Sequence, residues 1–201
     1  KKMNLNYVVL TTVNRDDLLN QGASHISRCI KAIQRRSPRL FIEMLMPDFR
    51  GDKELLQKII DATPSVMAHN LETVRRLTPK VRDYRANYDQ SLEVLSYLKT
   101  NAPKGYTKSS LMLGLGESRR EILQAMEDLI DVGVDFLTIG QYLQPSRKHL
   151  KVFKFLHPKE FDELGKIGEQ MGFDYVAAGP LVRSSYKAAE FYIERKIRGT
   201  A

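Results

Sequence analysis

The stretch Lys108-Ser-Ser-Leu-Met-Leu-Gly-Leu-Gly-Glu117 decides the fold. Its apolar middle, Leu111 to Leu113, is short and bounded by polar residues and glycines, which is typical of a strand buried on both faces. Two glycines end it, and a helical pattern begins at Glu121. Strand, glycine turn and helix form half of a βαβ unit, and such sheets bind ligands at their carboxyl edge. Glu117 would place a carboxylate there, and a plain turn with one exposed acid is the alternative.

The same alternation runs through the whole chain. Short apolar segments at 7–13, 40–47, 66–70, 136–142 and 174–178 predict further strands. Helical patterns separate them, among them 22–36 and 158–171, and a last helix is expected at 185–195. An open doubly wound sheet and a barrel are both possible, but polar clusters follow nearly every strand, which favours a barrel rim. We therefore predict an α/β fold with parallel strands in an incomplete, TIM-like βα barrel.

Composition limits the classes of function. The 201 residues are 42% apolar and 28% charged, as in a globular protein of one domain. No segment reaches the ~20 apolar residues of a membrane span, and no signal-peptide pattern is present. The formal net charge of +8 favours acidic partners. No compact basic and aromatic motif indicates nucleic-acid binding.

Cysteine is nearly absent from the chain. The single Cys29 excludes an internal disulfide and an all-cysteine metal site within these residues. It falls on the apolar side of the predicted helix with Ile26 and Ile30. We therefore predict a buried, structural thiol.

Several polar residues stand where a site is expected. Residues 14–17 follow the first predicted strand directly, as a site or as a solvated loop with a helix cap. Glu43 lies inside an apolar strand, where a carboxylate needs a partner. Asn70 and Glu72 stand at the junction of the third strand with the next helix. His69 could be a ligand, but a lone histidine at a strand end is more often hydrogen-bonded scaffold.

Five segments carry a resemblance to a known family. They are residues 9–18, 69–74, 88–92, 140–147 and 179–186. Together they resemble lipoyl synthase, from Tyr7 to the tail, and the Arg-Ser-Ser-Tyr sequence at 183–186 is a particular mark of that family.

The resemblance implies a fold and an activity. Lipoyl synthase is a radical S-adenosylmethionine (SAM) sulfurtransferase with a partial βα barrel of six repeats. It inserts two sulfurs at C6 and C8 of an octanoyl chain carried on a lysine. Its cofactors are SAM and two 4Fe–4S clusters, one that cleaves SAM and an auxiliary one that supplies sulfur. The implied partners are octanoylated lipoyl carrier domains of 2-oxoacid dehydrogenase E2 or glycine-cleavage H protein. We expect a monomer in the bacterial cytoplasm or the mitochondrial matrix, with neither nucleic acid nor membrane as a partner.

The chain departs from the family in its cysteines. The family's CxxxCxxC motif and its three auxiliary-cluster cysteines are absent, so the chain reads as the C-terminal two-thirds of the pattern. We expect one partial radical SAM barrel over 1–201, with its first strand missing, a C-terminal extension over about 172–201, and no activity on its own. The alternative is a cluster-free, non-catalytic module that binds acidic lipoyl carrier domains through its basic rim.

Site residues follow from the family motifs. The resemblance implies that Ser185 is the fourth ligand of the auxiliary cluster, although a helix cap would suit the same position. Arg183 would order this segment or touch the cluster. Residues 142–147 would lie near the octanoyl chain or the carrier.

The implied SAM contacts are looser. Residues 111–117 resemble the strand beneath adenine and ribose, and Glu117 ends that strand's turn. Asn70 and Glu72 are positioned for the ribose or the aminocarboxylate, and Arg82 for the SAM carboxylate. Lys108 and Gln141 would supply further polar contacts.

Overall fold

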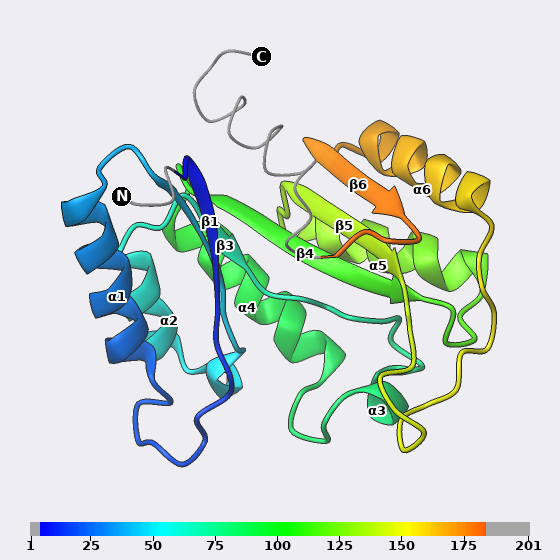
Figure 1. Cartoon of the computed structure of the whole chain (residues 1–201), viewed down its shortest axis with the longest axis horizontal. Coiled ribbons are helices and arrows are strands. Elements are labelled where there is room, and N and C mark those ends of the chain that lie inside the picture. The colour runs from blue at the N-terminus through cyan, green and yellow to red at the C-terminus, as the bar shows by residue number, and fades with distance from the viewer. Residues whose placement is uncertain (1–4, 184–201) are drawn as a thin grey trace.

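Six parallel strands alternate with helices along the chain (Figure 1). The protein is described here by a computed structural model, which covers residues 5–183. The elements are β1 (Tyr7–Thr11), α1 (Ala23–Arg36), β2 (Phe41–Leu45), η1 (Phe49–Gly51), α2 (Lys53–Ile60), β3 (Val66–Ala68), α3 (Thr78–Val81), α4 (Tyr88–Asn101), β4 (Tyr106–Leu113), α5 (Arg119–Asp131), β5 (Phe136–Gln141), α6 (Pro158–Met171) and β6 (Tyr175–Gly179).

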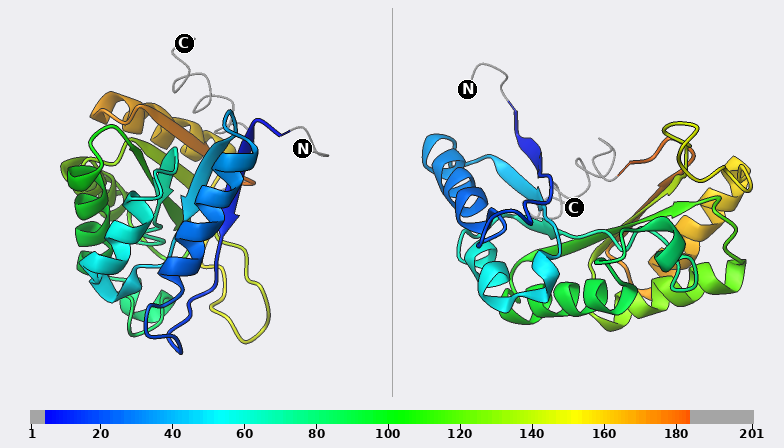
Figure 2. Two further views of the ribbon diagram at one scale, coloured as in Figure 1. Left: turned by 90° about the vertical axis from the view of Figure 1, so that its left-hand side faces the viewer. Right: turned by 90° about the horizontal axis from the view of Figure 1, so that it is seen from below.

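The sheet is an incomplete barrel. Its strands follow one another in the order β1 to β6, and every neighbouring pair is parallel. Viewed from below, the sheet curves into an open arc, with the helices on its convex side (Figure 2). Within residues 5–183, β1 pairs only with β2 and β6 only with β5, so the arc does not close. The predicted α/β partial barrel of parallel strands is confirmed.

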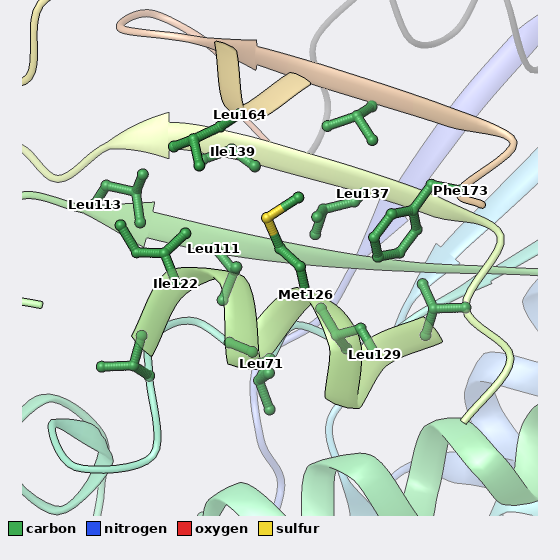
Figure 3. Packing of buried hydrophobic residues seen from close by; sticks show 14 of the residues in the cluster. Leu71, Leu111, Leu113, Ile122, Met126, Leu129, Leu137, Ile139, Leu164 and Phe173 are labelled. Atoms are coloured by element: carbon green, nitrogen blue, oxygen red, sulfur yellow. The ribbon is translucent and has the colours of Figure 1, made fainter. Parts of the chain in front are cut away.

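Packing of the helices on the convex face holds the arc together. Leu111 and Leu113 of β4 lie against Ile122 and Met126 of α5, in a cluster that continues to Leu164 of α6 (Figure 3). All of these side chains are 5% exposed or less. Burying one such side chain fully stabilises the fold by about 1.5–3 kcal/mol. Because successive residues of a strand face opposite sides, Lys108, Ser110 and Met112 of β4 are directed to the concave face.

Local sequence signals fix the helix ends. Ser118 and Glu121 form a reciprocal capping box at the start of α5. Gly172 ends α6 with a φ of 115°, as a left-handed C-terminal glycine does. The elements η1 and α3 were not predicted, and both are too short to show a periodic pattern. The helix expected at 185–195 lies outside the described residues.

Cys29 is only partly buried, with its Sγ 3.5 Å from Nε2 of His25, so the prediction of a buried thiol is wrong. Ile26 and Ile30 of the same helix are buried. The apolar stripe of α1 is therefore narrower than the sequence suggested, and Cys29 lies at its margin. No helix within 5–183 has the length and apolar character needed to cross a membrane.

Candidate functional site

A polar cavity opens at the carboxyl ends of β1, β2 and β3. Its volume is about 220 Å³. The lining residues are Thr12, Asn14, Leu45, Met46, Pro47, Asp48, His69, Asn70, Glu72, Arg82 and Ala86. Asn70, Glu72 and Arg82, which the sequence singled out, therefore meet at one place on the rim. Asp48 also lines the cavity, and its place in a loop after a strand was the only sequence feature that pointed to it.

Backbone geometry sets the position of Glu72. The regular pairing of β3 ends at Ala68, and the chain rejoins β4 at Glu72, whose N–H donates to Ser110 O at 2.9 Å. The carbonyl of Glu72 accepts from the N–H of Met112 at 2.8 Å. Between these bonds Glu72 adopts a φ of 71°, a left-handed conformation that is unfavourable for a residue with a Cβ. The strand pairing thus forces the carboxylate into its place at the cavity.

The Glu72 carboxylate lies in a largely desolvated position. Burial raises its pKa, and a hydrogen bond from Asn70 together with the charge of Arg82 opposes that rise. Asn70 Nδ2 donates to Glu72 Oε1 at 3.1 Å. The pair therefore presents one amide and one carboxylate, which can bind hydroxyl or ammonium groups.

Arg82 is the cationic group of the cavity. It follows α3 and is half-buried, and burial lowers its pKa while Glu72 and Asp48 raise it. Its Nη1 donates to Ser91 Oγ at 2.7 Å. No carboxylate within 5–183 forms an ion pair with it, whereas Arg75, Arg76 and Arg85 are each paired with an acid. The guanidinium therefore has N–H donors left for an anionic ligand.

His69 also lines this cavity and is 4% exposed. Its Nδ1 is 3.1 Å from Met46 O, and its Nε2 is 3.0 Å from Ser91 Oγ. Both ring nitrogens are thus occupied, which confirms the interpretation of His69 as hydrogen-bonded scaffold.

Lys108 lies deeper, on the concave face of β4. Its Nζ is 2.7 Å and 3.0 Å from the two carboxylate oxygens of Glu43. The Tyr7 hydroxyl donates to the same carboxylate. The side chains of Lys108 and Glu43 are 3% and 1% exposed, so the sequence was right that Glu43 needs a partner. The structure therefore separates Lys108 from the three residues at the cavity.

Gln141 and Glu117 hold the neighbouring loops of the rim. Gln141 Nε2 donates to the carbonyl of Lys154 at 3.1 Å, and its Oε1 accepts from the N–H of Leu156 at 3.0 Å. Glu117 accepts from the N–H of Leu115 at 2.9 Å and lines a second cavity of about 170 Å³. A Cβ on Gly114 would come within 2.2 Å of Gln141, so the glycine allows this close approach.

The loop after β1 is tied to the rest of the rim by charge. Asp16 pairs with Arg85 at 2.6 Å and with Arg50 at 3.3 Å. This exposed arrangement contributes little to stability, since surface ion pairs are worth about 0–1 kcal/mol. Within residues 14–17, Asn14 lines the cavity and Asp16 connects the loop to Arg85 and Arg50.

The remaining predicted residues lie near the C-terminal boundary of the description. Arg183 is exposed and donates to Val182 O at 2.7 Å. That carbonyl lies over Gly140, where a Cβ would come within 2.2 Å of it. Ser185 and the helix cap weighed against it lie outside the described residues. Within 5–183, no group of three His, Cys, Asp or Glu side chains could hold a metal ion.

Comparison with known proteins decides the family. The family model of the radical SAM superfamily matches residues 1–129. This chain belongs to the radical SAM superfamily. It is 55% identical over 195 residues to the lipoyl synthase of Myxococcus xanthus, a match that covers 96% of this chain and 65% of the relative. It is 53% identical over 190 residues to the mitochondrial lipoyl synthase of Branchiostoma floridae, which covers 94% of this chain and 50% of the relative.

The chain thus spans about half to two-thirds of the length of these relatives. The structure of methylornithine synthase superposes with a TM-score of 0.66 at 15% identity, covering 85% of this chain and 49% of that one. At this identity the likeness concerns the fold alone. It supports the description of the arc as a partial βα barrel. The resemblance to lipoyl synthase inferred from the motifs is confirmed.

Proposed function

We propose that this chain is the greater part of a lipoyl synthase, which inserts two sulfurs at C6 and C8 of a protein-bound octanoyl-lysine in a radical SAM reaction. The observation that carries the proposal is an identity of 49–55% to proteins named lipoyl synthase over nearly all of the chain. The same observation does not favour the alternative of a cluster-free binding module.

The rim cavity fits part of SAM. Arg82 would bind the carboxylate, because its guanidinium is half-buried and has N–H donors available. Asn70 and Glu72 would bind the ribose hydroxyls or the ammonium group. Bound SAM supplies the group that abstracts hydrogen. The protein's own residues orient SAM and limit its access to water.

The other predicted cofactor residues would act on SAM indirectly. Gln141 and Glu117 would keep the loops around SAM in place, since both are engaged with backbone groups of those loops. Lys108 would act from beneath the site through Glu43. Arg183 would order the segment that leads to Ser185.

The residues present do not fit an iron–sulfur cluster. A 4Fe–4S cluster is held by several thiolates, and the sequence has only Cys29, which lies on α1 beside His25. We propose that the cysteine ligands of both clusters come from outside these 201 residues, with Ser185 as the one ligand this chain provides.

The partner proposed for the rim is an octanoylated lipoyl carrier domain, of 2-oxoacid dehydrogenase E2 or glycine-cleavage H protein. Residues 142–157 include Arg147, Lys148, Lys151 and Lys154 and no acid, and Phe153 and Phe155 are 78% and 68% exposed. Such a loop suits an acidic domain that carries an acyl chain. We propose a monomeric enzyme of the bacterial cytoplasm or the mitochondrial matrix, since relatives of both origins match.

A chimaera tests this function. In it, the chain replaces the matching part of the Myxococcus xanthus lipoyl synthase, which supplies the cluster-ligating cysteines. We expect 5′-deoxyadenosine and lipoylated octanoyl peptide, both measured by mass spectrometry. A folded, cluster-loaded chimaera that makes neither product would refute the proposal.

The role of Ser185 is tested in the same chimaera. Ser185→Ala should keep 5′-deoxyadenosine formation and folding but make little or no lipoyl product, because only the auxiliary site loses a ligand. Loss of a helix cap would cost about 1 kcal/mol and leave the chemistry intact. Ser184→Ala is the matched control and should retain product formation. Lipoyl product at the parental rate from Ser185→Ala would leave only the capping role.

A further inference from the structure

His69 is fixed in the fold from three directions. Its backbone N–H donates to Lys108 O of β4 at 3.1 Å. One ring nitrogen lies against the carbonyl of Met46, at the end of β2, and the other against the hydroxyl of Ser91, on α4. The ring therefore joins the end of one strand to the helix that passes behind the cavity.

The contacts define which nitrogen carries the proton. A carbonyl oxygen only accepts, so Nδ1 carries the hydrogen that faces Met46 O. In the neutral ring, Nε2 then accepts from the hydroxyl of Ser91. Burial is the main cause that lowers the pKa of His69 to about 4, and the charge of Arg82 lowers it further against Met46 and Asp48. His69 is therefore neutral near pH 7.

The hydroxyl of Ser91 contacts both His69 and Arg82, so the orientation of its hydrogen links the two side chains. A hydroxyl has one hydrogen and two lone pairs. When its hydrogen is given to His69, a lone pair faces the Nη1 of Arg82, which donates at 2.7 Å. The competing acceptor is the carbonyl of Asn87, 3.1 Å from the same oxygen. Without the imidazole, the hydroxyl would turn to Asn87 and Arg82 would lose the constraint set by His69.

We propose that His69 is a positioning residue, which through Ser91 holds the guanidinium of Arg82 in the orientation that receives the carboxylate of SAM. The inference rests on the proposed function, because that function supplies SAM as the ligand. It assigns His69 no contact with SAM and no part in proton transfer. Its consequence is that His69 affects binding of the carboxylate alone, not of the nucleoside.

Two substitutions of the ring separate positioning from packing. His69→Asn keeps a donor near the Nδ1 position but no longer reaches Ser91. His69→Gln places an amide near the Nε2 position and does reach it. Affinities of the 201-residue chain for SAM and for decarboxylated SAM are measured by isothermal titration calorimetry. We expect His69→Asn to weaken SAM binding roughly tenfold, with decarboxylated SAM unchanged within about twofold, and His69→Gln to retain most of the affinity.

A double-mutant cycle tests the route through Ser91. Ser91→Ala should weaken SAM binding about as much as His69→Asn, and the double variant should be no weaker than either single variant. His25→Asn is the matched control, because His25 is an exposed histidine on α1 and should change neither affinity. Full additivity of the two losses would overturn the proposal, as would equal weakening of both probes by His69→Asn.

A second measurement needs no ligand. Rotation of the Arg82 guanidinium, followed by ¹⁵N NMR, should be slow in the parent chain and in His69→Gln but fast in His69→Asn. Unchanged rotation in His69→Asn would overturn the positioning role even if SAM binds. Should the parent bind neither probe, the SAM site of the proposed function is wrong in this chain, and the NMR result still decides how His69 acts on Arg82.

Discussion

Two groups of opposite charges lie on the concave side of the sheet, and they differ in what they leave unpaired. In the barrel interior, Lys108 and Glu43 are 2.7 Å apart at their closest atoms and almost fully buried. At the rim, Arg82 and Glu72 share a cavity, yet Arg82 binds a hydroxyl and no carboxylate of the described chain. In the interior, the two charges neutralise each other, so this pair contributes to the stability of the fold. At the rim, Arg82 keeps N–H donors that a ligand can use, so this group contributes to ligand binding.

The largest effect is expected from the interior pair. Lys108→Met leaves the buried Glu43 carboxylate without its cation, which should lower the free energy of unfolding by about 3–5 kcal/mol. Urea denaturation measures this loss. Glu43→Gln combined with Lys108→Met removes both charges, keeps an acceptor for Tyr7, and should recover most of the stability. A double variant as unstable as Lys108→Met would show that the pair is not what holds this region.

The buried His69 should also make the stability of the fold depend on pH. Because the folded pKa of His69 is about 4, against 6.5 for the free group, the unfolded chain binds more protons between these values. Stability that is present above pH 6.5 is therefore lost as the pH falls towards 4, by roughly 3 kcal/mol at most. Chemical denaturation at a series of pH values should show this slope in the parent and a smaller one in His69→Gln. Equal slopes in both would contradict the low pKa of His69.

At the rim, in contrast to the interior pair, removal of the cation should affect ligand binding more than stability. Arg82→Met should weaken SAM binding by about 2 kcal/mol, since it removes charge-assisted hydrogen bonds. It should change the free energy of unfolding by less than about 1 kcal/mol, because Arg82 has no carboxylate partner within 5–183. Calorimetry and urea denaturation on one preparation measure both. A large loss of stability with unchanged affinity would mean that the two groups do not differ as described.

The smallest effect concerns Asn70. Its amide stabilises the charged form of Glu72, so Asn70→Ala should raise the pKa of the Glu72 carboxyl further. A titration followed by ¹³C NMR of the side-chain carboxyl measures this. A lowered pKa at Glu72 would show that Asn70 does not donate to it in solution.

The sequence anticipated the strands more fully than the contacts at their ends. Short apolar runs located all six strands within a few residues, because burial on both faces leaves a local signature. Glu43 revealed its need for a partner, but Lys108 is 65 positions away and becomes its neighbour only through the curvature of the sheet. Ser91 belongs to the motif at 88–92, but its contacts with His69 and Arg82 could not be predicted from its neighbours on α4. The burial of Cys29 was predicted wrongly, because the sequence does not reveal how wide a strip of helix α1 is covered by the rest of the fold.

At Glu72, the left-handed backbone conformation lowers stability, while the side chain places a carboxylate at the cavity. A side chain at that φ costs about 1–2 kcal/mol, which glycine would avoid. Variants selected for heat resistance alone would therefore favour glycine at this position, and they would lose the carboxylate from the cavity. A search for a more stable form of this protein should keep residue 72 fixed and look for added stability on the helices of the convex face.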